Sequence, residues 1–267
     1  MKNLLKPFYL NLTLDSEIDP WQVFESPWSD YLKKLESHIS DRKGVDVSLI
    51  GGKKSDGSHL ILPRINFDVA KSVFKHFGIF SGLAPDSFSS FAATAAFIEF
   101  HSGRSRRHVE DYRLSIYPIS YAEAYLRGFS SALSDDLGNS LWKGDPDPSI
   151  GILEREIVVQ QFDGVIRISS DSVDSIKIRC SSEIVAQQVV DVAITEDKGS
   201  WSSHDQVFLE PWRTDRDSLM IGAKIKYRPL EIHLVLPEDA DTSYRATQLI
   251  FQILILYRHY FAIQGDL

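Results

Sequence analysis

The clearest pattern in the chain is an alternation of apolar and polar residues with a period of two, which is typical of β-strands with one buried face. Residues 8–14 show this alternation, as do residues 176–180 and 230–236. Residues 45–50 and 59–62 read as two further strands, joined by a polar loop rich in glycine. The pattern therefore predicts strands in both halves of the chain.

Other segments place apolar residues three or four positions apart, as on the buried face of a helix. Residues 66–77 fit such a helix, with Gly78 as its end, and residues 87–100 fit a second one, in which small residues are surrounded by phenylalanines. Residues 182–192 and a segment from about 242 to 262 predict two more helices.

The middle of the chain combines a turn signal with a shift in composition. Residues 156–162 and 165–169 flank Asp163-Gly164, a dipeptide that favours the tight turn of a β-hairpin. Residues 138–150 are rich in aspartate, proline and glycine, as in a linker.

The order of these elements is mixed, which favours an α+β fold with largely antiparallel sheets. We expect a mixed N-terminal half (1–137), an acidic linker (138–150) and a β-rich C-terminal half (151–267) closed by a long apolar helix. The alternative is that the two halves pack as a single domain.

Charge and cysteine content narrow the function classes. The 267 residues include 29 basic and 37 acidic side chains, giving a formal charge of −8, which disfavours a general nucleic-acid-binding surface. The single Cys180 excludes internal disulfides and multi-cysteine metal sites, and its strand position indicates a core residue. No segment has the length and apolarity of a signal peptide or a membrane span, so we expect a cytoplasmic protein without membrane contact.

None of the common catalytic motifs is present. Residues 51–55 lack the spacing of a phosphate-binding loop, and the patterns GxGxxG, GxSxG and HExxH do not occur. Ser203, His204 and Asp205 are adjacent in sequence, whereas a catalytic triad brings distant residues together. No cofactor and no metal site is therefore predicted.

One polar cluster follows the helix of residues 87–100 and could bind an anion. Three arginines within four residues suit a phosphate or a carboxylate, and a histidine beside a carboxylate suits acid–base catalysis. The ligand-binding candidates are His101, Arg104, Arg106 and Arg107, and the catalytic candidates are His108, Glu110 and Asp111. The alternative is a solvated connecting loop.

Tryptophan and arginine residues that fall in predicted loops suggest a protein interface. These residue types carry much of the binding energy at interfaces, and the candidates are Trp201, Trp212, Arg213 and Arg216. The leading hypothesis is an interaction protein, such as an adaptor, an assembly subunit or an inhibitor or immunity-type partner, with an unidentified protein partner and no catalysis. The alternative hypothesis is an enzyme or binding module that acts on phosphate or nucleic acid through residues 101–113.

Overall fold

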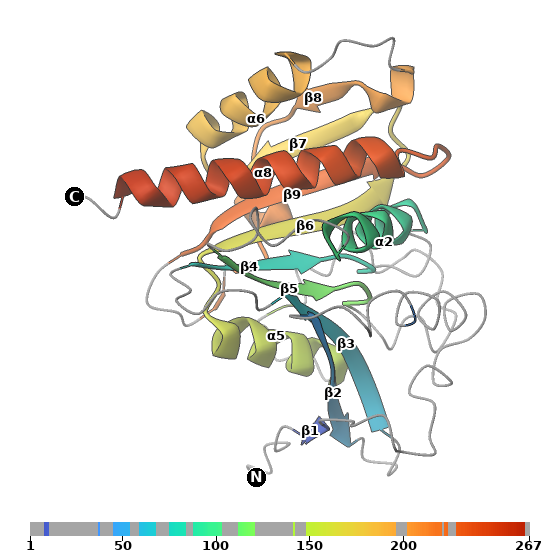
Figure 1. Ribbon diagram of the computed structural model, residues 1–267, viewed down its shortest axis with the longest axis vertical. Coiled ribbons are helices and arrows are strands. Elements are labelled where there is room, and N and C mark those ends of the chain that lie inside the picture. The colour runs from blue at the N-terminus through green and yellow to red at the C-terminus, as the bar shows by residue number, and fades with distance from the viewer. Residues whose placement is uncertain are drawn as a thin grey trace.

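The computed structural model describes residues 8–10, 37, 45–53, 59–67, 75–83, 88–102, 112–120, 141, 148–195, 202–220, 222–223 and 228–264 (Figure 1). Its strands are β1 (Phe8–Leu10), β2 (Val45–Lys53), β3 (His59–Phe67), β4 (Lys75–Phe80), β5 (Tyr112–Tyr117), β6 (Gly164–Asp171), β7 (Ile176–Cys180), β8 (Val207–Leu209) and β9 (Leu230–Pro237). Its helices are α2 (Phe88–Ser102), α5 (Pro148–Gln160), α6 (Glu183–Thr195), α7 (Thr214–Asp217) and α8 (Ser243–Gln264), with a short 3-10 helix, η3 (Ser203–Asp205).

All the described strands belong to one sheet, in the order β1-β2-β3-β5-β4-β6-β9-β7-β8. The pairs β1–β2, β2–β3, β3–β5 and β7–β9 are antiparallel. The pairs β5–β4, β4–β6, β6–β9 and β7–β8 are parallel. The expectation of largely antiparallel sheets is therefore wrong for the centre of the sheet, where β5, β4, β6 and β9 run in the same direction.

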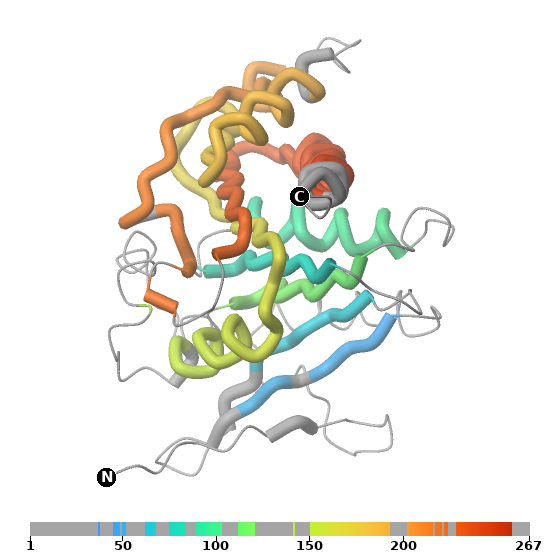
Figure 2. The backbone as a smooth tube through the Cα atoms, turned by 90° about the vertical axis from the view of Figure 1, so that its left-hand side faces the viewer, coloured from blue at the N-terminus to red at the C-terminus, as the bar shows by residue number. Residues whose placement is uncertain are grey.

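Helices cover both faces of the sheet. Helices α2, α6 and α8 pack on one face, over a core that includes Ile166 and Ile232. Helix α5 packs on the opposite face, where Leu153 and Ile157 contact a second core that includes Val165. Figure 2 shows α5 on the other side of the sheet from α2 and α8. Neighbouring residues of β6 therefore face different layers, as the two-residue period of a strand requires.

Several predicted elements are confirmed. The strands expected at 45–50 and 59–62 are β2 and β3, which pair antiparallel from Val45↔Phe67 to Lys53↔His59. The strands expected at 176–180 and 230–236 are β7 and β9, and the helix expected at 87–100 is α2.

The helix predicted at residues 66–77 is wrong, because Lys75–Phe80 forms β4. His76 to Phe80 are all buried, since this strand lies in the middle of the sheet with a helical layer on each face. A strand that is buried on both faces has no polar alternation, and its apolar run can match a helical period by chance.

The hairpin predicted around Asp163-Gly164 is also wrong. Residues 156–160 belong to α5, and Gln161 ends this helix with a φ of 49°. Asp163 instead receives a hydrogen bond from the backbone N–H of His76, and its own N–H donates to the carbonyl of His76. Asp163 therefore connects the start of β6 to β4 and does not form a two-residue turn.

Strands from both sides of the expected linker share the single sheet, with β6 directly beside β4. Of residues 138–150, the structure describes Leu141, which is buried, and 148–150, which begin α5. The division of the chain at this segment stays a prediction.

The description of the C-terminal helix as apolar is not confirmed. Helix α8 buries Arg245, Thr247 and Gln252 together with its apolar residues, and it exposes Tyr244 and Ile255. No helix in the described part of the chain is long and apolar enough to cross a lipid bilayer.

Candidate functional site

A row of polar side chains lies on the α5 face of the sheet, across β6, β9 and β7. Ile166 and Ile168 face α2 and α8, so Arg167 and Ser169 of the same strand point to the opposite face. The same alternation in β9 places Glu231 and His233 on this face, and in β7 it places Arg179 there. The end of helix α7 adds Asp217, which contacts His233 and Arg179 and completes a polar cluster.

Three of these residues form a continuous chain of hydrogen bonds. The hydroxyl oxygen of Ser169 lies 2.7 Å from Nε2 of His233. Nδ1 of His233 lies 2.9 Å from Oδ1 of Asp217. We refer to Ser169, His233 and Asp217 as the triad, because a hydroxyl, an imidazole and a carboxylate in this order can activate a nucleophile.

The hydrogen-bond partners determine where the proton on His233 lies. An ionised Asp217 carboxylate can only accept hydrogen bonds, so Nδ1 of His233 carries the proton and donates it to Asp217. In the neutral ring, Nε2 is then an acceptor for the hydroxyl of Ser169. This is the tautomer in which a histidine can take a proton from serine.

The pKa shifts agree with this assignment. Burial, together with the charge of Arg167, lowers the pKa of His233 to about 3, although Asp217 acts to raise it, so the ring is neutral at pH 7. Burial acts to raise the pKa of Asp217, but hydrogen bonds from His233 and from the backbone of Arg213 outweigh it and lower the pKa to about 2. Asp217 is therefore ionised at neutral pH.

Further contacts fix Asp217 in this position. Its Oδ2 accepts a hydrogen bond from the backbone N–H of Arg213 at 2.8 Å, and its Oδ1 accepts one from Nη1 of Arg179 at 3.1 Å. Arg179 also donates to Oε2 of Glu210 through Nε at 2.9 Å and Nη2 at 2.7 Å. The carboxylate of Asp217 is thus held by three donors, of which His233 is one.

Exposure differs along the triad in the way that catalysis requires. Asp217 is 1% exposed and His233 is 4% exposed, whereas Ser169 is only partly buried. Ser169 lies two residues before the carboxyl end of β6, and ligands of open α/β sheets bind at the carboxyl ends of parallel strands. The nucleophile candidate is therefore the most accessible member of the triad.

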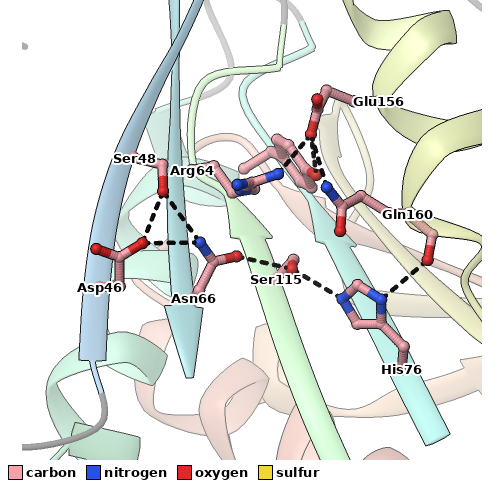
Figure 3. A network of polar contacts seen from close by, with 9 residues as sticks. Asp46, Ser48, Arg64, Asn66, His76, Ser115, Glu156 and Gln160 are labelled. Carbon is pink, nitrogen blue, oxygen red and sulfur yellow. Dashed lines mark hydrogen bonds and ion pairs between the residues drawn. The ribbon is translucent and has the colours of Figure 1, made fainter. Parts of the chain in front are cut away.

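A second serine–histidine pair lies on the same face of the sheet, closer to β2 (Figure 3). Ser115 Oγ lies 2.9 Å from His76 Nε2, and His76 Nδ1 lies 3.0 Å from the carbonyl oxygen of Gln160. The hydroxyl of Ser115 donates to Asn66, whose amide donates to Asp46. Ser115 is fully buried, and a carbonyl takes the place that Asp217 has in the triad, so this pair is a structural contact and not a reactive one.

The same view shows the polar contacts that join helix α5 to the sheet. Oε2 of Glu156 accepts hydrogen bonds from Arg64 at 2.8 Å, from the hydroxyl of Tyr117 at 3.0 Å and from Gln160 at 3.4 Å (Figure 3). Glu156 and Tyr117 are buried, so this ion pair connects α5 to β3 and β5 inside the molecule.

Most of the sequence-predicted polar cluster lies outside the described residues. This applies to Arg104, Arg106, Arg107, His108, Glu110 and Asp111. His101 is described, and its assignment to a surface loop is wrong. It belongs to the last turn of α2, is buried, and packs against the rings of Phe67 and Phe97 at 4.8 and 5.3 Å between centroids.

The predicted interface residues lie close to the triad in sequence. Trp201 is outside the described residues, Trp212 is half-buried and Arg213 is exposed. Arg216 belongs to α7, one residue before Asp217. These residues stay candidates for an interface, since no contact with a partner tests them. Cys180 is buried, as expected, and burial raises the pKa of its thiol to about 11.

Sequence reasoning missed the triad, whose members are separated by 48 and 16 positions along the chain. No motif has this spacing. A signal was nevertheless present in the strand of residues 230–236, where Glu231 and His233 alternate with leucine and isoleucine. In a strand that is buried on both faces, such titratable residues must find buried partners.

Among the residues that the structure describes, no group of three or more histidine, cysteine, aspartate or glutamate side chains could hold a metal ion. At the carboxyl end of β6, Ser170 accepts a hydrogen bond from the backbone of Ser90, and Ser89 donates to the carbonyl of Glu238 after β9. These two contacts join the first turn of α2 to the carboxyl ends of β6 and β9.

Comparisons with known proteins find similar folds among solved structures but no relative by sequence. No family model matches the sequence. No curated protein matches it either. The structure is similar to a metallo-carboxypeptidase from Burkholderia cenocepacia, with a TM-score of 0.67, 12% identity, and coverage of 90% of this chain and 71% of that one. A metallo-carboxypeptidase from Pseudomonas aeruginosa, in complex with (2-guanidinoethylmercapto)succinic acid, gives a TM-score of 0.63 at 12% identity, over 91% and 70% of the two chains. A succinylglutamate desuccinylase from Silicibacter gives 0.55 at 13% identity, over 81% and 68%.

These similarities overturn the leading sequence-based hypothesis. An adaptor or complex subunit without catalysis was expected, but the three similar structures named above are enzymes. The word metallo in two of these names implies a metal ion, and the described residues of this chain do not fit one. At 12–13% identity the likeness concerns the fold alone. The chain thus has the mixed α/β fold that these carboxypeptidases share with a desuccinylase.

Proposed function

We propose that this protein is a hydrolase that cleaves an ester or amide bond, with Ser169 as the nucleophile, His233 as the general base and Asp217 as the carboxylate that orients the base. The observation that carries the proposal is the unbroken chain of hydrogen bonds from the Ser169 hydroxyl through His233 to Asp217, at 2.7 and 2.9 Å. The likeness of the fold to enzymes named carboxypeptidase and desuccinylase supports a hydrolytic reaction.

The reaction would proceed in two steps. The oxygen of Ser169 attacks the carbonyl carbon of the substrate while its proton moves to Nε2 of His233, and the leaving group then departs with that proton. Water hydrolyses the resulting ester on Ser169, with His233 again taking a proton, and the serine is restored. Asp217 stabilises the positive ring that forms in each step.

The arginines around the triad affect both charges that develop. Arg167 lies in register with His233 on the neighbouring strand, and its charge disfavours a second positive charge on the ring. The same charge would attract the negative oxygen that forms on the substrate. In this mechanism the nucleophile, the base and the orienting carboxylate are all side chains of the protein itself.

The test compares the wild-type protein with Ser169→Ala on a panel of nitrophenyl esters and N-acyl amino acids. We expect the variant to lose roughly a thousandfold or more in kcat/KM, since removal of a triad nucleophile has effects of this size. A fluorophosphonate probe followed by peptide mass spectrometry should label Ser169. The matched control is Ser172→Ala, an exposed serine three residues away, which should keep full activity.

Two results would contradict the proposal. One is unchanged hydrolysis by Ser169→Ala. The other is hydrolysis that a chelator abolishes and that a divalent metal ion restores, because the reaction would then depend on a metal held by residues other than the triad.

A further inference from the structure

Glu231 makes contacts that the proposed reaction does not use. It lies on the same face of β9 as His233, two residues before it. Its Oε1 accepts a hydrogen bond from the hydroxyl of Ser218 at 2.6 Å, and its Oε2 accepts one from the backbone N–H of Leu219 at 2.7 Å. Because these two residues directly follow Asp217, β9 holds Asp217 through His233 and the next two residues through Glu231.

The segment that Glu231 holds is buried and depends on it. Ser218, Leu219 and Met220 are all buried. A buried N–H without an acceptor costs free energy comparable to a lost hydrogen bond, so the Leu219 N–H needs the Glu231 carboxylate. The other end of the segment is fastened by Arg228, whose Nη1 donates to the carbonyl of Met220 at 2.6 Å.

We infer that Glu231 is a positioning residue, which holds residues 217–220 against β9 and thereby keeps Asp217 within hydrogen-bonding distance of His233. Its effect on the reaction rests on the proposed function. Its effect on the segment concerns the fold alone and can be measured without any substrate.

Protonation of Glu231 changes the hydrogen bonds that it makes to this segment. A carboxylate accepts through both oxygens, whereas a carboxylic acid gives up acceptor capacity on the oxygen that carries the proton. Burial raises the pKa of Glu231 to about 7, although the hydrogen bonds from Ser218 and Leu219 act to lower it. The titratable and charged groups around Glu231 are Arg167 on β6, Cys180 on β7, His233 on β9, Asp217 on α7, Arg228 before β9 and Tyr257 on α8.

The test uses Glu231→Gln in the full chain, with Glu183→Gln as the matched control because Glu183 is an exposed glutamate at the start of α6. Glutamine replaces one carboxylate oxygen with an NH2 group, so one of the two donors would face another donor in place of its acceptor. We expect hydrogen exchange in residues 217–220 at pH 8 to speed up at least about tenfold in Glu231→Gln and to stay unchanged in Glu183→Gln.

The kinetic readout is a separate one. In the wild-type protein, kcat for a nitrophenyl ester should rise with pH through about 7 as Glu231 ionises. In Glu231→Gln this rise should disappear and kcat at pH 8 should fall at least about tenfold with little change in KM, since a displaced Asp217 affects the chemical step more than binding.

A second variant tests the inference in case Glu231→Gln does not fold. Ser218→Ala removes one donor to Glu231 and the acceptor of the Met220 N–H but keeps the carboxylate, so exchange in residues 217–220 should speed up while kcat still rises with pH through about 7. Unchanged exchange in both variants would overturn the inference, as would an active Glu231→Gln enzyme with the wild-type pH profile. Faster exchange together with an inactive wild-type protein would overturn the proposed function and leave the positioning of residues 217–220 supported.

Discussion

Gly164 begins β6 at a point where two aromatic rings leave no room for a larger residue. A Cβ at this position would lie 2.8 Å from ring atoms of Phe77 and of Tyr257, both fully buried. The hydroxyl of Tyr257 donates to the carbonyls of Val165 and Leu230, so the ring cannot move away without breaking these bonds. The side chain of Tyr257, on α8, is thus held against the backbones of β6 and β9.

We expect Gly164→Ala to lower the free energy of unfolding by roughly 1–3 kcal/mol, as overpacking of a core does. Urea denaturation measures this change. The control is Gly151→Ala in α5, where a Cβ would meet no atom within 4 Å. Because alanine is the better helix former, this control should gain up to about 1 kcal/mol. Equal stability of the two variants would contradict the close packing around Gly164.

At the scale of elements, α5 depends on an ion pair buried under it. Glu156 accepts from Arg64 of β3 and from Tyr117 of β5, and Glu156 is 2% exposed. The helix also contributes Leu153 and Ile157 to the core on this face. Its attachment to the sheet therefore combines apolar burial with one buried ion pair.

We expect Glu156→Ala to destabilise the protein by about 3–5 kcal/mol, because it leaves the charge of Arg64 buried without this partner. Adding Arg64→Met to Glu156→Ala should recover most of the lost stability, since the double variant no longer buries the charge of Arg64. Thermal unfolding of the single and double variants checks this. Val159→Ala, at a half-exposed position of the same helix, should change stability by less than about 0.5 kcal/mol. An additive double variant would show that the pair is not coupled.

Strands in which apolar and polar residues alternate were predictable from the sequence, including the fully buried β9, whereas β4 lacks this alternation and was not. The hairpin of β2 and β3 has alternating residues and a glycine-rich loop, so its position was predicted closely. Strand β4 is buried throughout, and its apolar run was taken for a helix. Helix α5 was taken in part for a strand, because the turn signal of Asp163-Gly164 outweighed the helical spacing of Ile150, Leu153 and Ile157.

At the scale of the whole molecule, the triad is a product of topology. Its serine, carboxylate and histidine come from β6, α7 and β9, and only the parallel pairing of β6 with β9 brings Ser169 to His233. The residues that the sequence analysis selected were adjacent in the chain, at 101–113, since adjacency is the only proximity a sequence displays. A site whose residues come from separate strands can be found only when the order of the strands is known. The sequence did not predict that order.

The opposed pKa shifts of His233 and Glu231 predict a plateau in the pH dependence of stability. His233 has its pKa lowered from 6.5 to about 3, so its contribution is present above pH 6.5 and is lost as the pH falls toward 3. Glu231 has its pKa raised from 4.5 to about 7, so its contribution is present below pH 4.5 and is lost as the pH rises through 7. Between pH 6.5 and 4.5 the two changes cancel.

Below pH 4.5 the compensation ends, and the free energy of unfolding should fall with pH. The slope for each group is about 1.4 kcal/mol per pH unit, and Asp217, whose pKa is lowered from 3.8 to about 2, adds its own loss in that range. Urea denaturation between pH 3 and 8 measures the profile. In Glu231→Gln the free energy of unfolding should begin to decline near pH 6.5. Identical pH profiles of the wild-type protein and this variant would contradict the raised pKa of Glu231.

The position of β9 in the sheet has a consequence for the order in which the protein is made. β9 lies between β6 and β7, although both of these strands precede it by 50 residues or more in the chain. A nascent chain that has reached residue 229 therefore has two central strands with unpaired backbone edges next to each other, and neither the sheet nor the triad is complete. Such edges are prone to pair with other chains, so we expect ribosome-bound intermediates of this length to depend on chaperones until the last two elements emerge.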